Sequence, residues 1–143
     1  MNTARKGIIG ESFAKIDLIK RGLYPHKPEL DDDGVDFIVE MKPEKIAKGL
    51  YTKGKTFTLQ VKYRTTYDST DSVVFDIKKT RADWVALVHE IEQPNGLSSA
   101  VVMYVKNKRY NKRWQISMRI GNKSNDKQRK LIHDWQDYIN PKF

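Results

Sequence analysis

The spacing of apolar residues predicts one helix near the N-terminus. The helix is expected at 6–21, with Gly22 as its C-terminal stop. The residues that supply its apolar stripe are Ile8, Ile9, Phe13, Ile16 and Ile19. Glu11 lies beside that stripe. A second helix is predicted at 124–138, where Ser124 is a candidate N-cap and the apolar residues that follow recur at helical spacing.

Between the two helices, alternating and apolar runs separated by turn residues predict a series of strands. The predicted strands are 35–41, 56–63, 73–77, 84–91, 100–105 and 114–120, preceded by an extended segment at 23–30. The predicted connections are a turn at 31–34, a lysine-rich hairpin loop at 42–55, a polar loop at 64–72 and an exposed hairpin tip at 107–111. The order helix, strands, helix indicates the α/β (α+β) class, with a mixed central sheet flanked by helices.

Two of the predicted strands carry polar residues where buried strands carry aliphatic ones. Asp36 follows an acidic turn, and Gln60 and Lys62 interrupt the run from Thr56 to Tyr63. Alternate side chains of a strand share a face, so Gln60 and Lys62 point together, away from the face of their apolar neighbours. This arrangement is typical of a site in which polar side chains bind a metal ion beside a lysine.

Composition limits the classes of function. The chain has 143 residues, which fits one domain over 1–143. Cysteine is absent, which excludes disulfides, thiolate zinc sites and cysteine nucleophiles. No signal peptide or membrane-length apolar run occurs in the sequence, so we expect a cytoplasmic protein without a membrane partner.

The charge is uneven along the chain. The net charge of +9 favours a polyanionic partner, and the segment 105–130 holds ten lysines and arginines against one aspartate. Acidic residues instead gather between Glu29 and Glu44. A local acidic cluster in a basic protein indicates a cation site beside a nucleic-acid surface.

Phosphodiester hydrolysis explains why these residue types occur together. Mg²⁺ activates water and neutralises charge on the phosphate when carboxylates and backbone oxygens hold it. Asp36 is predicted to be the central ligand, with the Gln60 amide oxygen, the Val61 carbonyl and Glu11 as further ligands. Lys62 is suited to orient the attacking water and hold the phosphate. Taken singly, each residue also fits a solvated surface position.

In these segments the sequence resembles the PD-(D/E)xK nuclease superfamily. The segments that carry the resemblance are 6–11 with Ala14 and Gly22, then 34–39, then 59–62. The resemblance implies a restriction-endonuclease-like αβββαβ core with catalytic roles for Glu11, Asp36, Gln60 and Lys62. Gln60 departs from the usual Glu or Asp, and a neutral amide binds Mg²⁺ more weakly than a carboxylate.

The Gln-x-Lys variant and the small size are most similar to the homing endonucleases encoded in cyanobacterial group I introns, and more distantly to archaeal Holliday junction resolvases. The predicted function is therefore a Mg²⁺-dependent endonuclease of double-stranded DNA, in which Mn²⁺ substitutes for Mg²⁺. The alternatives are a junction resolvase and a DNA-binding module that has lost catalysis through Gln60. A homo-oligomer, dimer or tetramer, would place two sites on opposite DNA strands.

Exposed basic and amide residues are the predicted DNA contacts. They are Lys78, Lys79, Arg81, Lys106, Lys108, Arg109, Asn111, Lys112 and Arg113, with Asn107 and Tyr110 beside them in the hairpin tip. The histidines are scattered without metal-ligand spacing, and the tryptophans sit in apolar patterns, so both are predicted to be structural or exposed rather than catalytic.

Overall fold

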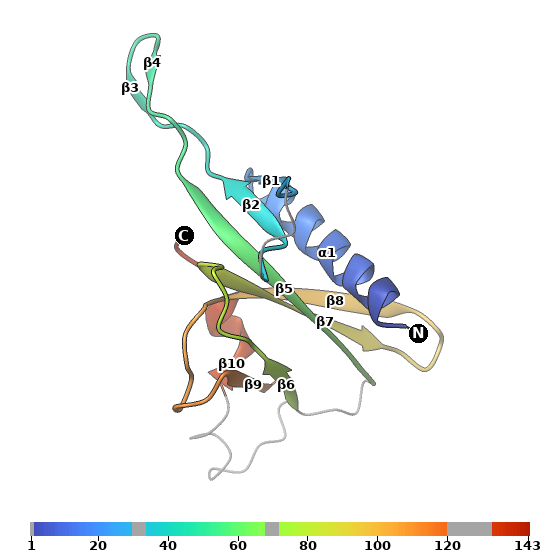
Figure 1. Ribbon diagram of the computed structural model, residues 1–143. Coiled ribbons are helices and arrows are strands. Elements are labelled where there is room, and N and C mark those ends of the chain that lie inside the picture. Colours follow the sequence, from blue (N-terminus) through green and yellow to red (C-terminus); the bar gives the residue numbers. More distant parts are fainter. Residues whose placement is uncertain (1, 30–33, 68–71, 120–132) are drawn as a thin grey trace.

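The computed structural model describes residues 2–29, 34–67, 72–119 and 133–143 (Figure 1). The first half contains α1 (Thr3–Lys20), β1 (Tyr24–His26), β2 (Phe37–Glu40), β3 (Lys45–Ala47), β4 (Leu50–Tyr51) and β5 (Thr56–Tyr67). The second half contains β6 (Ser72–Asp76), β7 (Trp84–Glu92), β8 (Ser98–Lys106), β9 (Gln115–Arg119), β10 (His133–Asp134) and a 3₁₀ turn, η1 (Trp135–Tyr138). The mixed α+β class is confirmed, with more strand than helix among these residues.

A five-stranded mixed sheet forms the centre of the molecule, in the order β1-β2-β5-β7-β8. The first three strands form an antiparallel meander, β7 runs parallel to β5, and β8 returns antiparallel to β7. The parallel pairing spans Leu59 opposite Trp84 to Tyr67 opposite Glu92. The strand predicted at 56–63 therefore continues to Tyr67, into the segment predicted to be a polar loop; residues 68–71 of that loop lie outside the described residues.

The first helix lies across β5, β7 and β8, but it buries a different face from the one the apolar stripe predicted. Gly10, Ala14 and Leu18, four residues apart, are its buried residues. Ile8 is 64% exposed, and Ile16 and Ile19 are also exposed. The prediction of the core-facing stripe was wrong because small residues allow the helix to approach the sheet closely: a Cβ on Gly10 would lie 2.7 Å from the Tyr63 Cβ.

A second, smaller sheet covers the opposite face of the main sheet. Its order is β10-β9-β6, and its strands β6 and β9 pack with β7 and β8 in an apolar cluster. The buried residues of that cluster are Val73, Phe75, Ile77, Val85, Leu87, Met103, Val105, Ile116 and Met118. In the described part of the chain, this face is thus covered by strands and not by the flanking helix that was expected.

The predicted C-terminal helix is also replaced where the structure describes it. Residues 133–134 form β10, parallel to β9, and 135–138 form η1. The remainder of the predicted helix, 124–132, lies outside the described residues, as do 31–33 of the predicted turn. Trp135 and Tyr138, whose spacing predicted a helix, instead pack against the small sheet.

The predicted loop at 42–55 contains a two-stranded ribbon of its own, formed by β3 and β4, which Figure 1 shows projecting beyond the main sheet. The chain therefore forms the hairpin that joins β2 to β5, but with an ordered extension. No helix of the described residues is long and apolar enough to cross a membrane.

Candidate metal and nucleic-acid site

Asp36 is fixed to β5 through both its backbone and its side chain. Its amide N donates to the Leu59 carbonyl at 2.8 Å, and its Oδ2 accepts from the Val61 amide N at 2.7 Å. These two bonds lie on either side of Gln60. Because the N–H and C=O of one strand residue point to the same side, the Val61 carbonyl also points toward the edge where Asp36 lies.

Glu11 brings a second carboxyl to Asp36 from α1. Burial raises the pKa of Asp36, and the charge of Glu11 and a side-chain hydrogen bond with it raise this pKa further. The Val61 N–H and the charge of Lys27 act in the opposite direction. Two carboxyls this close repel each other when both are ionised, so a proton or a cation between them is favoured.

Lys27 is a member of this site that the sequence did not reveal. Its Nζ lies 2.6 Å from Glu11 Oε2 and 4.9 Å from the centroid of the Phe37 ring. It follows β1 between two prolines, in a segment whose pattern indicates only an extended edge. The one available signal was its position in the sequence, where Lys27 lies between Glu11 of the helix and the acidic residues that precede the next strand.

Gln60 is buried, with 5% of its surface exposed. Its Oε1 atom has no hydrogen-bond partner among the described residues. An unsatisfied buried acceptor costs roughly 1–3 kcal/mol, so we expect this oxygen to bind a water molecule or a cation in solution. The role of the Gln60 amide oxygen as a metal ligand stays a prediction.

Lys62 is half-buried on the same face of β5 as Gln60, in register with Leu87 of β7. The cation that acts on the pKa of Asp36 is Lys27. Lys27 is therefore the lysine that the structure brings to the carboxyl pair, whereas Lys62 lies on the face of β5 that carries Gln60.

The donor set of this site fits a hard cation. In the part of the chain that the structure describes, no three His, Asp or Glu side chains gather closely enough to hold a metal by themselves. Glu11 and Asp36 supply two carboxyls, and Val61 can add a backbone oxygen. The amide of Gln60, the other predicted ligand, projects from the face of β5 opposite the one that packs against α1. Oxygen ligands of these kinds are the ones that Mg²⁺ and Ca²⁺ prefer. The acidic cluster predicted to surround the site is more scattered, since Glu40 pairs with His26 at 3.5 Å and Glu44 belongs to the ribbon.

Gly34 connects this site to the basic part of the molecule. Its φ of +73° places it in the left-handed region, and a Cβ there would lie 2.3 Å from Thr80 Cγ2 and 2.9 Å from Gln60 Nε2. Thr80 belongs to the connection 77–83 between β6 and β7. The loop that carries Lys78, Lys79 and Arg81 is therefore in contact with the residues around Gln60.

The structure brings the two predicted DNA-contacting segments together. Asn107 Nδ2 donates to Thr80 Oγ1 at 2.8 Å and to the Ala82 carbonyl at 3.0 Å, and the Ile77 amide N donates to the Trp114 carbonyl at 2.9 Å. These bonds correct one prediction: the Asn107 amide joins two loops and is not directed at a base edge. Tyr110 is likewise engaged, since its hydroxyl donates to the Lys106 carbonyl at 3.0 Å.

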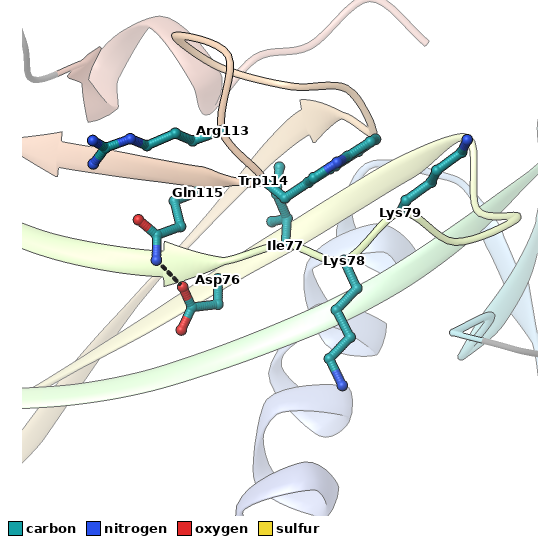
Figure 2. A pocket seen from close by; sticks show the side chains of 7 residues that line it. All are labelled: Asp76, Ile77, Lys78, Lys79, Arg113, Trp114 and Gln115. Carbon is teal, nitrogen blue, oxygen red and sulfur yellow. Dashed lines mark hydrogen bonds between the residues drawn. The ribbon is translucent and has the colours of Figure 1, made fainter.

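A groove of about 630 Å³ lies where these segments meet (Figure 2). Its lining residues are Asp76, Ile77, Lys78, Lys79, Arg113, Trp114 and Gln115. In Figure 2, Asp76 and Gln115 are joined across β6 and β9 by a hydrogen bond of 2.6 Å, and the cationic side chains extend from both sides of the groove. This surface is complementary in charge to a phosphate backbone.

The tip beside the groove is a tight turn over residues 110–113. Two backbone hydrogen bonds join Tyr110 and Arg113, and the central residues Asn111 and Lys112 have φ of 51° and 63°. Positive φ at both positions is the pattern of a type I′ turn, in which a lysine is unusual. The predicted contacts Lys106, Lys108, Arg109, Asn111, Lys112 and Arg113 are all exposed, as are Lys78, Lys79 and Arg81. The part of the basic segment beyond Arg119 lies outside the described residues.

The remaining sequence predictions concern structural residues. His89 is buried, with Thr66 Oγ1 2.5 Å from its Nε2, and burial lowers its pKa to about 4. His26 is exposed and His133 packs between Tyr110 and Tyr138. The tryptophans pack against the two apolar clusters.

Comparisons of the chain with protein-family models, curated proteins and solved structures give no match.

Proposed function

We propose that this protein is a metal-dependent endonuclease of double-stranded DNA, of the PD-(D/E)xK type and most like a homing endonuclease. The observation that carries the proposal is the approach of Glu11 to Asp36, at the point where Asp36 is bonded to Val61. The unpartnered Gln60 oxygen supports it, and so does the contact of the basic loop 77–83 with Gly34. This contact joins the loop that carries Lys78, Lys79 and Arg81 to the segment just before Asp36.

In this proposal Glu11, Asp36, Gln60 and Val61 hold Mg²⁺ or Mn²⁺, which supplies Lewis-acid stabilisation of the phosphate and a more acidic water. Lys62 contacts the scissile phosphate, where its charge opposes the negative charge that grows in the transition state. Lys27 holds the Glu11 side chain in place through their ion pair. The basic surface at 77–81 and 106–113 holds the flanking phosphates and sets the position of the duplex.

Cleavage tests the proposal directly. A plasmid library of random duplex sequence is incubated with the protein and Mg²⁺ or Mn²⁺, and new ends are mapped by sequencing. Asp36→Asn should reduce the rate by at least about 100-fold, because even residues that only support a metal ligand contribute 10–100-fold. Glu40→Gln is the matched control, since Glu40 is an exposed acid at the far end of β2, and should cut like the parent. Lys62→Ala should be slow, with the exposed Lys15→Ala as its control.

Uncut DNA with the parent protein in either metal would refute the endonuclease. Cleavage of synthetic four-way junctions of unrelated sequence, with linear duplex spared, would identify a junction resolvase instead. We further propose that two or more copies act together, because one site cuts one strand. Light scattering of the DNA-bound protein measures this, and a single copy per duplex would contradict it.

One observation favours the second candidate, a DNA-binding module without catalysis. The ion pair of Lys27 with Glu11 neutralises one of the two carboxylates without any metal. In that case duplex binding would depend on salt but not on Mg²⁺. Gln60→Glu separates the two candidates, because an added carboxylate should increase cleavage by a nuclease and leave the binding module inactive.

A further inference from the structure

The ribbon that joins β2 to β5, here termed the ribbon arm and defined as residues 42–55, is an ordered projection. Thr52 donates its amide N to the Glu44 carbonyl at 2.8 Å, and the Glu44 amide N donates to Thr52 Oγ1 at 3.0 Å. Gly49, with φ of +78°, turns the chain at the tip. Figure 1 shows the arm extending past the end of the main sheet.

The arm is strongly basic and exposed. Its charged residues are Lys42, Lys45, Lys48, Lys53 and Lys55 against Glu44 alone. Every residue from 42 to 53 is exposed. Such a charge excess on a projecting element attracts a polyanion and is not accounted for by any contact within the described residues.

Apolar side chains are exposed on the same arm. Ile46, Leu50 and Tyr51 are 68%, 61% and 61% exposed. An isolated two-stranded ribbon gains little stability from its own contacts, and apolar residues held in solvent at its tip do not stabilise it. The combination of cations with exposed apolar side chains is suited to a surface that presents both phosphates and the apolar edges of bases.

The base of the arm is held firmly to the main sheet. The Met41 amide N donates to the Lys55 carbonyl at 2.7 Å, and a Cβ on Gly54 would lie 2.2 Å from the Met41 carbonyl oxygen. Glycine at 54 therefore permits a crossing that other residues would block. The arm joins β2, which directly follows Asp36, to β5, which carries Gln60, so its position is tied to the candidate metal site.

We propose that the ribbon arm binds in a groove of duplex DNA, about one helical turn from the phosphate at the candidate metal site. A two-stranded ribbon fits the major groove, which is about 12 Å wide. Extended chain rises roughly 3.3 Å per residue, so the residues from Asp36 to Lys45 span at most about 30 Å, against about 34 Å for one turn of duplex. The groove contact stands on the arm itself, while its distance from the cut rests on the proposed nuclease.

Charge removal tests the contact. The triple variant Lys45→Ala, Lys48→Ala, Lys53→Ala is compared with Lys6→Ala, Lys15→Ala, Lys20→Ala, which removes the same charge from exposed positions of α1. Binding of a 40-base-pair duplex of arbitrary sequence is measured by fluorescence anisotropy in EDTA over a series of salt concentrations. The arm variant should lower the slope of log affinity against log salt by up to about 2.7, at about 0.9 per lost phosphate contact, while the control leaves it unchanged.

A second variant, Ile46→Ser, Leu50→Ser, Tyr51→Ser, separates apolar contact from charge. We expect about 10-fold weaker binding with the salt slope unchanged. Because these side chains are exposed, both arm variants should keep the thermal unfolding midpoint of the parent. An arm variant with the salt slope and affinity of the parent would overturn the inference, as would a parent that binds no duplex. A change of molecular mass in light scattering of the DNA-free arm variant would assign the arm to self-association instead.

Cleavage distinguishes this inference from the proposed function. Arm-dependent binding by a protein that never cuts would refute the nuclease and leave the arm's groove contact standing. If the protein cuts DNA but its binding does not depend on the arm, only the proposed groove contact of the arm is refuted. At a mapped cut site, nuclease protection by the parent should extend about 10 base pairs outward from the phosphate that each copy cleaves, and the arm variant should lose that extension.

Discussion

The two faces of strand β5 differ in what they bury. One face places Leu59, Val61 and Tyr63 against α1, in a cluster of apolar side chains. The other carries Gln60 and Lys62 under the small sheet, where the neighbouring β7 also buries His89. A single strand thus has one face suited to packing and one that retains polar groups at a cost in stability.

The difference separates stability from function along one element. The apolar side chains on the α1 face are satisfied by contacts within the protein. The Gln60 oxygen, in contrast, has no hydrogen-bond partner among the described residues. Buried polar groups without partners are selected against unless they bind something. The polar face of β5 is therefore where a ligand is expected, and variants on the two faces should respond differently.

The largest effect should come from the apolar residues of both faces. Leu18→Ala, in α1, and Phe75→Ala, in β6 of the small sheet, should each lower the free energy of unfolding, by about 2–5 and 3–5 kcal/mol, because both side chains are fully buried. Urea unfolding monitored by tryptophan fluorescence measures this. A loss below about 1 kcal/mol for Phe75→Ala would show that the small sheet does not stabilise this face.

Acid should act on the polar face through His89. Its pKa in the folded protein is about 4, below the ordinary 6.5, so the unfolded chain binds the proton more readily. The stability that neutral His89 contributes is complete above pH 6.5 and is lost as the pH falls toward 4, on the order of 3 kcal/mol in total. Unfolding midpoints of the parent and His89→Gln, measured from pH 7 to 4, should converge.

Asp36 should act in the opposite direction over acidic pH. Because its pKa in the folded state is raised, the fold binds this proton more tightly than the unfolded chain does, and protonation stabilises the protein. The comparison for His89 is therefore repeated in an Asp36→Asn background, which removes this contribution. In that background, the curves of unfolding midpoint against pH with His89 and with His89→Gln should still converge. Parallel curves would show that His89 does not cause the loss of stability in acid.

Two glycines of α1 test how closely that helix meets the apolar face. Gly10→Ala should destabilise by about 1–3 kcal/mol, because the new Cβ would meet Tyr63 Cβ at 2.7 Å. The matched control is Gly7→Ala, which has nothing within 4 Å and should gain about 0.4–1 kcal/mol from helix propensity. Thermal unfolding of both variants gives the comparison, and equal gains would mean that the helix lies farther from β5.

The smallest effect on stability is expected at Gln60. Gln60→Leu removes the unpartnered oxygen at nearly constant volume, so the metal-free protein should be unchanged or more stable by up to about 1 kcal/mol. Cleavage should nevertheless be lost, and Mg²⁺ should raise the unfolding midpoint less than it does for the parent. A variant that is clearly less stable than the parent would show that Gln60 is satisfied by the protein itself.

Sequence periodicity predicted the strands well and the helix contacts poorly. Val85 and Leu87 alternate with the residues of the opposite face, so the strand at 84–91 was recognisable from its pattern. In α1 the isoleucines suggested one buried side, but close approach to Tyr63 requires small residues, and Gly10 and Ala14 carry no apolar signal of that strength. Trp135 and Tyr138 likewise have the spacing of a helix, but they pack against strands.

The candidate site was predicted in part for a related reason. Residue type and strand alternation identified Asp36, Gln60 and Lys62, because those polar residues interrupt apolar strands. The contact of Glu11 with Asp36, the ion pair of Lys27 and the role of Asn107 in joining two loops depend on how separate segments pack. That packing is not encoded in any local pattern, so it became visible only in the structure.

The pairing of β6 with β9 also has a consequence during synthesis. Phe75 is in register with Ile116, 41 residues later in the chain. At about 5–20 residues per second, the apolar residues of β6 wait roughly 2–8 s for the strand that pairs with them. The apolar residues of β6 are therefore exposed during this interval and open to association with other chains until β9 has been made.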